Sequence, residues 1–252
     1  MVKQRKHLKK GPKRVLLAIV IVAVIFLGCE VIEYQIIHNM ERTPVETHEN
    51  TYYTARDFGL IVEKSPYDFN INGIDDYTDI LNGAKIVAEI NPTYVSKYYA
   101  GGYPPENEGV CTDVIWRALM ESGYLLKDMM AKDIRDTYDE DVYGIEIVDD
   151  NIDFRRVGNQ ETFLKRYATS LTTDIEDIKE FMPGDIVTFN DSEHIAIISD
   201  KRNAHGIPYL IQNSDEEQTE KEEDVLEITD MVVTGHYRFT YNENLKELID
   251  SL

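Results

Sequence analysis

The chain has 252 residues, which is enough for one sizeable domain with additional segments at its ends. Its formal net charge at pH 7 is −21, although the first 14 residues contain seven Lys or Arg residues and no acidic residue. The rest of the chain is therefore strongly acidic and repels the phosphates of nucleic acids, which excludes nucleic acids as partners. Such a surface suits solvation, cationic ligands or bound cations.

The N-terminal residues predict a membrane segment. The basic residues 1–14 precede an uncharged run, residues 15–29, which spans roughly 22 Å as a helix. This is shorter than the ~30 Å hydrocarbon core of a bilayer, and apolar residues up to position 37 extend the run. The positive charges predict a single-pass protein of the cell membrane, with residues 1–14 in the cytoplasm and the C-terminal domain outside.

Three interpretations of this segment stay open. We expect a transmembrane signal-anchor helix over residues 15–37, followed by a stalk and linker over residues 38–65. A lipoprotein signal is the first alternative, because Leu27-Gly28-Cys29 resembles the end of a lipobox. A cleaved signal peptide is the second, although the usual Ala-x-Ala site is absent from the sequence.

Residues 68–79 have the spacing of a calcium-binding loop. Side chains with oxygen atoms stand at loop positions 1, 3, 5 and 9, with glycine at position 6 and a carboxylate at position 12, as in an EF-hand. Asp79 replaces the usual Glu at position 12, and an Asn/Asp-rich turn without a metal is the alternative. The pattern predicts a Ca²⁺ site formed by Asp68, Asn70, Asn72, Asp76, Asp79 and the main-chain carbonyl of Ile74.

A helix is predicted to begin at Cys111. Small or apolar residues recur with helical spacing from Cys111 to Ser122, and Gly123 stands where the helix would end. The unpaired N–H groups at a helix N-terminus favour an anion such as a thiolate. Cys111 is thus a candidate nucleophile, and the alternative is a small buried apolar side chain.

The remaining pattern predicts helices followed by strands, and therefore an α+β domain in which N-terminal helices pack on an antiparallel sheet. The strands after residue 185 are expected to form a meander, and residues 241–252 are expected to form a tail with a short helix. The other expected elements are helices over residues 77–90, 125–137 and 159–167, and strands over residues 186–189, 194–200, 209–213, 225–228 and 232–239.

Three residue types in this order are typical of papain-like cysteine hydrolases. Cys111 lies at a helix start, His194 opens a strand, and the next strand ends with the side-chain amides of Gln212 and Asn213. In such enzymes a thiolate attacks a carbonyl group, an imidazole accepts and returns the proton, and an amide fixes the imidazole tautomer. Strand alternation places Gln212 and Asn213 on opposite faces of the sheet.

Five segments resemble a bacterial family, the domain of unknown function 1287, over about residues 66–240. They are residues 109–114 (GVCTDV), 151–157 (NIDFRRV), 183–187 (PGDIV), 194–197 (HIAI) and 234–238 (TGHYR). The family is grouped with the NlpC-like, papain-fold cysteine hydrolases of cell walls. The resemblance implies Cys111 as nucleophile, His194 as general base and Asn213 as the third catalytic residue. Gln212 is the alternative to Asn213, and His236 is a rival base.

The expected function is a membrane-tethered extracellular cysteine hydrolase, an amidase or endopeptidase that acts on peptidoglycan peptides. Its partners are then a cell-wall peptide as substrate and the membrane through the N-terminal helix, and its catalysis needs no cofactor. The alternative is a catalytically inactive papain-like module that binds such peptides. A zinc site formed by Cys111, His194 and His236 is a third interpretation, which the absence of paired Cys/His spacings disfavours. Adjacent Arg155 and Arg156 either pair with acidic residues or hold a substrate carboxylate.

Overall fold

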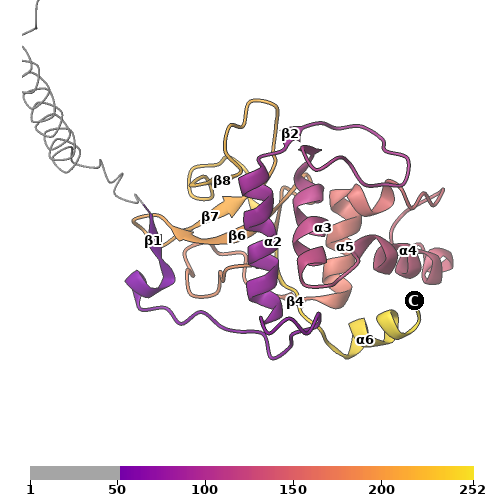
Figure 1. Cartoon of the computed structure of the whole chain (residues 1–252), viewed down its shortest axis with the longest axis horizontal. Helices are drawn as coiled ribbons and strands as arrows, with labels where there is room; N and C mark the ends of the chain where they lie inside the picture. The colour runs from indigo at the N-terminus through magenta and orange to yellow at the C-terminus, as the bar shows by residue number, and fades with distance from the viewer. Residues whose placement is uncertain (1–51) are drawn as a thin grey trace, which may run out of the picture. The chain divides into compact units, whose positions relative to one another are not determined.

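An antiparallel sheet and a layer of helices make up residues 52–252, the part of the chain that the computed structural model describes (Figure 1). The helices are α2 (Asp76–Ile90), α3 (Cys111–Glu121), α4 (Leu126–Asp136), α5 (Val157–Tyr167) and α6 (Glu243–Asp250), with 3-10 helices η1 (Ala55–Phe58), η2 (Tyr138–Glu140) and η3 (Asp153–Arg155). The strands are β1 (Tyr53–Thr54), β2 (Thr93–Tyr94), β3 (Glu108–Gly109), β4 (Thr169–Ser170), β5 (Ile186–Phe189), β6 (His194–Arg202), β7 (Pro208–Ile211), β8 (Glu222–Glu223) and β9 (Val233–Arg238).

The main sheet has seven strands in the spatial order β4-β9-β5-β6-β7-β8, with β1 also pairing with β6. All of these pairs are antiparallel, whereas β2 and β3 form a separate parallel pair. The α+β class with an antiparallel sheet is therefore confirmed. Strands β5 to β8 follow one another as the predicted meander, but β9 crosses over to the other edge of β5, where Ile186 pairs with Tyr237.

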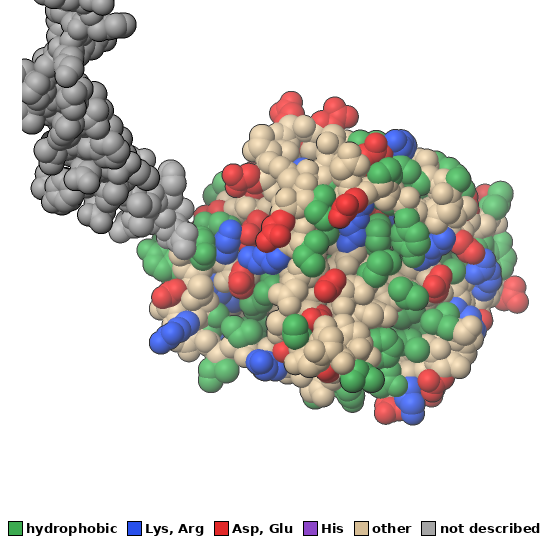
Figure 2. Space-filling view, viewed as in Figure 1, with side chains coloured by type: hydrophobic (Ala, Val, Ile, Leu, Met, Phe, Trp, Pro, Cys, Tyr) green, Lys and Arg blue, Asp and Glu red, His purple; other side chains and the backbone are tan. Residues whose placement is uncertain are grey.

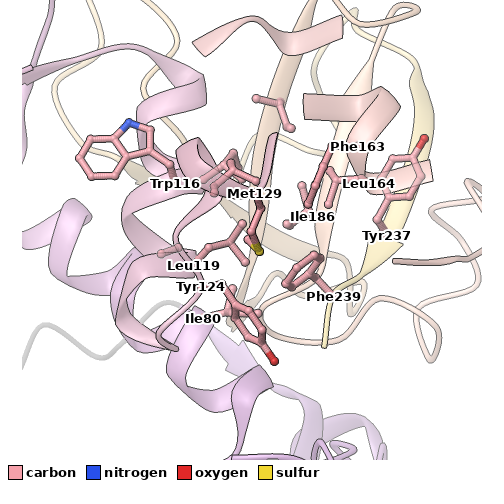
Figure 3. Packing of buried hydrophobic residues seen from close by; sticks show 14 of the residues in the cluster. Ile80, Trp116, Leu119, Tyr124, Met129, Phe163, Leu164, Ile186, Tyr237 and Phe239 are labelled. Atoms are coloured by element: carbon pink, nitrogen blue, oxygen red, sulfur yellow. The ribbon is translucent and has the colours of Figure 1, made fainter. Parts of the chain in front are cut away.

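The central strands are buried on both faces, which explains their nearly continuous apolar sequence. In β6, Ile195 and Ile197 belong to the cluster under the helices, and Ala196 and Ile198 belong to a second cluster on the opposite face, which loops cover. We call these two faces the helix side and the loop side. Figure 3 shows the packing of the helix side, whose large residues include Ile80, Trp116, Leu119, Tyr124, Met129, Phe163 and Phe239.

One predicted strand is wrong. Residues 225–228 form a turn, and the strand of this region is β8, which lies inside the acidic run that we expected to be a loop. Glu222 of β8 pairs with Ile211 of β7 and accepts ion pairs from Lys85 and Lys201. These two cations compensate the charge that would otherwise disfavour an acidic edge strand.

The compact unit extends beyond residues 66–240, the range expected for the domain. Strand β1, which lies in the expected linker, pairs with the end of β6. Helix α6, which lies in the expected tail, buries Leu245 and Leu248 in the helix-side core. Both segments therefore belong to the folded body.

The predicted membrane segment, residues 15–37, and the alternative lipid-attachment residue Cys29 lie outside the described residues. Within residues 52–252, no helix has the length and apolar composition needed to cross a bilayer. The longest helix there, α2, has 15 residues and carries charged side chains.

Helices α2 and α3 approach each other closely at Gly83. A Cβ atom at this position would lie 2.8 Å from the Cα of Ala118 on α3, which is closer than packed atoms allow. The glycine therefore sets the spacing between the helix that follows the calcium-type loop and the helix that begins at Cys111.

We expect the substitution Gly83→Ala to destabilise the protein by about 1–3 kcal/mol, because the added methyl group forces α2 and α3 apart. This loss outweighs the gain in helix propensity of up to ~1 kcal/mol that alanine brings. Gly158→Ala in α5 is the matched control, since its nearest neighbour would be a Ser192 atom 3.9 Å away. Urea unfolding measures both, and equal free energies of unfolding for the two variants would contradict the close approach.

Candidate functional site

Cys111 is the first residue of α3, as predicted. The preceding Val110 has extended backbone angles, and its N–H donates to Oδ2 of Asp113 at 2.8 Å, which closes the helix start. The Cys111 side chain is half-buried and packs against the helix-side core. The thiol thus stands at a helix N-terminus, where main-chain N–H groups favour an anion.

A buried ion pair fixes this helix start. Arg155 donates from Nε to Oδ1 and from Nη2 to Oδ2 of Asp113, both at 2.7 Å, and both side chains are at most 2% exposed. The indole N–H of Trp116 donates to the same carboxylate at 2.7 Å, and Arg155 also donates to the carbonyl of Lys97 at 2.9 Å. Arg155 therefore pairs with an acidic residue and does not face a substrate. Sequence reasoning did not find this pair, because 42 residues separate its members.

The Cys111 sulfur lies beside the start of β6. Burial raises the pKa of Cys111 to about 11, and the negative charge of Asp113 acts in the same direction. The main-chain N–H groups of Ile195 and Thr112 oppose this rise, because they favour the thiolate. The thiol is therefore protonated at neutral pH, and a base must take its proton before it can act as a nucleophile.

His194 is the first residue of β6, as predicted, and its side chain is buried. Its Nε2 atom lies 2.8 Å from Oε1 of Gln212. Since this oxygen only accepts hydrogen bonds, Nε2 carries the proton and Nδ1 keeps a lone pair. Burial lowers the pKa of His194 below its ordinary value, while the hydrogen bond that His194 donates to Gln212 and the negative charge of Asp215 act to raise it. A neutral imidazole with a free nitrogen has the properties of a general base.

The predicted third residue, Asn213, does not contact His194. Its Nδ2 donates to the carbonyl of Gly109 at 3.0 Å and more weakly to that of Pro92 at 3.4 Å, and its buried Oδ1 has no hydrogen-bond partner. The reason is strand alternation: Gln212 shares the loop side of the sheet with His194, and Asn213 lies on the other face. The contact with the imidazole therefore belongs to Gln212, and Asn213 supports the segment before Cys111.

The thiol and the imidazole approach the end of β6 from different sides. Cys111 packs against the helix-side cluster, whereas His194 lies against Phe189 of the loop side, with 5.8 Å between the ring centroids. No hydrogen bond within residues 52–252 joins the two side chains. The start of β6 links them, because Ile195 follows His194 and its main-chain N–H favours the thiolate form of Cys111.

His236, the rival base, belongs to a different cluster. Its Nε2 lies 3.0 Å from Oδ2 of Asp185, its Nδ1 lies 2.7 Å from the carbonyl of Thr172, and its ring stacks on Phe181. Asp185 also accepts two hydrogen bonds from Arg238 at 2.8 Å. This buried cluster joins β9 to the turn before β5, so His236 has a structural role.

The calcium-type loop brings four of its six predicted ligand residues together. Nδ2 of Asn70 and Nδ2 of Asn72 donate to the same oxygen of Asp79 at 3.0 and 2.9 Å, and Asp68 accepts the N–H of Gly73 at 2.8 Å. Asp76 points elsewhere, since its carboxylate accepts from Tyr124, Thr240 and the N–H of Phe69. Ile74 donates its N–H to Asn72. The donor set fits a hard cation in part, without Asp76 as a direct ligand.

Within residues 52–252, no three side chains of His, Cys, Asp or Glu are grouped so that they could hold a metal ion. The calcium-type loop has only two carboxylates that converge, and its other oxygen atoms come from asparagines. The zinc interpretation is therefore wrong for the described structure, because His236 is held in its own cluster by Asp185.

Comparison with known proteins identifies the family of this chain. The profile of a family described as "Domain of unknown function (DUF1287)" matches residues 81–239. The chain belongs to the DUF1287 family. A relative, "Uncharacterized protein YijF" of Escherichia coli (strain K12), is 35% identical over 154 residues, which cover 59% of this chain and 73% of the relative. No solved structure matches the chain. The family resemblance predicted from five short segments is thus confirmed, and it brings no established activity with it.

We expect Arg155→Met to destabilise this DUF1287 domain by about 3–5 kcal/mol, because it leaves the Asp113 carboxylate buried without its cation. Arg156→Met is the matched control, since the Arg156 side chain is 61% exposed and lies 3.7 Å from Asp153. Its expected effect is within about 1 kcal/mol. Chemical denaturation compares the two, and similar losses for both variants would show that the buried pair does not fix the helix start.

Proposed function

We propose that this DUF1287 protein is a papain-like, NlpC-like cysteine hydrolase, an amidase or endopeptidase that cleaves peptidoglycan peptides. One observation carries the proposal: Cys111 opens helix α3, which packs against β6, and His194 opens β6 with its ring oriented by Gln212. A thiol, a neutral base and an amide that fixes the tautomer are the groups that such a hydrolysis requires.

In the proposed mechanism, the Cys111 side chain turns toward His194 when the substrate binds. Nδ1 of His194 takes the thiol proton while the sulfur forms a bond to the carbonyl carbon, and the imidazolium then gives this proton to the leaving amine as the C–N bond breaks. Water hydrolyses the resulting thioester, again with His194 as the base. Gln212 holds the proton on Nε2 throughout and so keeps Nδ1 available.

The proposed setting is the outer face of the cell membrane. The basic residues 1–14 and the uncharged residues 15–29 support a single membrane-spanning anchor with the domain outside, and a lipoprotein attached through Cys29 is the alternative. A cell-wall peptide is the substrate class within reach of a domain held there. The strongly acidic composition suits a peptide that carries positive charge.

A second candidate function is a papain-like module that binds wall peptides without cleaving them. Two observations favour it: burial raises the pKa of Cys111 to about 11, and no hydrogen bond joins Cys111 to His194 within residues 52–252. A site of this kind keeps the fold and the groove of a hydrolase without an activated nucleophile.

Hydrolysis of purified peptidoglycan by the full chain, with products identified by mass, separates the two functions. We expect Cys111→Ala to abolish product formation and His194→Ala to lower kcat/KM by about 10²–10⁴-fold. His205→Ala is the control, because His205 is 71% exposed and pairs with Glu227 away from Cys111. Full hydrolysis by Cys111→Ala would exclude the mechanism, and binding without any product from the wild type would establish the binding module.

We also propose that the loop of residues 68–79 binds Ca²⁺ through Asp68, Asn70, Asn72 and Asp79, with the Ile74 carbonyl. Both asparagine side chains lie within hydrogen-bonding distance of the buried Asp79 carboxylate, and a 180° turn of each amide would direct its oxygen to an ion there, which supports this proposal. Burial raises the pKa of Asp79, and the negative charges of Asp68 and Asp76 add to this, so a cation at this point would relieve the repulsion.

Removal of Ca²⁺ tests the loop. With a dissociation constant of ~10⁻⁴ M and ~10⁻³ M calcium, binding adds about 1.4 kcal/mol to the free energy of unfolding, which chelation should remove. Asp79→Ala should abolish both this difference and the heat of Ca²⁺ binding in calorimetry. Asp139→Ala, an exposed acidic residue of η2, is the control and should bind as the wild type does. Equal heats for Asp79→Ala and wild type would refute the site.

A further inference from the structure

An open groove of about 750 Å³ begins at the proposed catalytic base. His194 and Gln212 line it at one end, and its walls come from the turn before β6, the loop after β7 and the turn after β8. The groove therefore lies on the loop side of the sheet and reaches the imidazole from the side opposite to the helices.

The groove is lined by carboxylates and by no Lys or Arg. The four acidic residues that line it are Glu193, Asp215, Glu217 and Glu223. The face of the molecule in Figure 2 differs in this respect, because Lys and Arg stand among its acidic side chains. Glu223 accepts a hydrogen bond from Gln218 at 2.6 Å, and Asp215 accepts the N–H groups of Glu217 and Gln218. These bonds order the loop, but they leave its negative charge in place.

Lys221 does not line the groove, although its charge acts on Asp215 and Glu223. Its side chain is buried, and its ammonium group donates to the carbonyl of Gln218 at 3.3 Å. Burial lowers the pKa of Lys221, while the charges of Glu223 and Asp215 oppose the shift. Lys221 forms no ion pair within the described residues, and its single charge offsets only part of the charge of the four carboxylates that line the groove.

A free hydrogen-bond donor lies at the inner end of the groove. The Gln212 side chain is only 4% exposed, and its Oε1 is used by His194. Its Nε2 donates to no residue of the described chain, and Gln212 lines the groove. An amide N–H beside the groove that has no partner in the described chain can donate to a ligand oxygen there.

The opposite wall is apolar. Val225, Ile228 and Met231 line it, and Ile228 is 76% exposed. An exposed isoleucine beside a carboxylate-lined floor matches a ligand that has both an alkyl chain and a charged end.

Tyr94 feels charges from both the thiol and the acidic loop. Burial raises the pKa of Tyr94, and the charges on Cys111 and Asp215 contribute to the rise. The negative charge of Asp215 also acts to raise the pKa of His194. A peptide in the groove would therefore lie beside the imidazole of His194.

We propose that this groove selects peptides that carry a free ammonium group, with a peptide carbonyl on Gln212 Nε2, the ammonium group among Asp215, Glu217 and Glu223, and an alkyl stem along Ile228. This inference rests on the proposed hydrolase function, because it takes the ligand of the groove to be the substrate of the enzyme. The ammonium group is either the α-amine of the peptide or the ε-amine of a lysine-type residue.

Calorimetry with the full-length Cys111→Ala protein tests the inference without turnover. The probes are the stem peptide L-Ala-γ-D-Glu-L-Lys-D-Ala with free amines, the same peptide acetylated on the α-amine, and the same peptide acetylated on the ε-amine. We expect one of the two acetylated peptides to bind about 2- to 5-fold more weakly, as the loss of a partly exposed ion pair predicts. The amine whose acetylation weakens binding is the one whose ammonium group the groove holds.

The additional substitution Glu217→Gln should remove this preference, because Glu217 lines the groove and its side chain accepts no hydrogen bond from the described residues. Glu216→Gln is the matched control, since the adjacent Glu216 is exposed outside the groove and its loss changes the net charge equally. Equal affinities for all three peptides, or equal effects of the two substitutions, would overturn the inference. Hydrolysis that depends on Cys111 but shows no preference for amines would leave the proposed function standing and reject the groove. A preference for a free amine without any hydrolysis would support the groove and reject the proposed hydrolase.

Discussion

The arrangement of the site depends on the buried pair of Asp113 and Arg155. Its carboxylate accepts the N–H of Val110, the indole N–H of Trp116 and two bonds from Arg155, so both oxygens are fully used. Such a pair contributes little net stability compared with apolar residues, but it tolerates no loss of either member. It joins the start of α3 to η3 and, through the Lys97 carbonyl, to the loop before the helix. The position of the thiol follows from these contacts.

The candidate site residues lie on both faces of the sheet. The thiol belongs to the helix side, the imidazole and its amide partner belong to the loop side, and the main chain at Ile195 connects them. In this arrangement the thiol is protonated at neutral pH and burial favours the neutral imidazole. Membership of the DUF1287 family is established by comparison, whereas hydrolysis and its substrate are proposals that rest on this geometry.

Local sequence patterns predicted the elements that depend on local contacts. The start of α3 at Cys111 and of β6 at His194 followed from helical spacing and from an apolar run. Contacts between distant residues could not be found in this way, as the pair of Asp113 and Arg155 shows. Side chains alternate between the two faces of a strand, and positions 194 and 212 lie on the same face of the sheet. If this alternation had been applied to both strands, it would have favoured Gln212 over Asn213 as the partner of His194. The acidic β8 was missed because Lys85 and Lys201 compensate Glu222 only in the folded structure.

The pairing of β1 with β6 separates the entry of the chain from the site. Tyr53 lies opposite Arg202, and His194 stands eight residues away at the other end of the strand, roughly 26 Å along it. Immobilisation of the protein through the residues before β1 therefore leaves the groove accessible to ligands from solution.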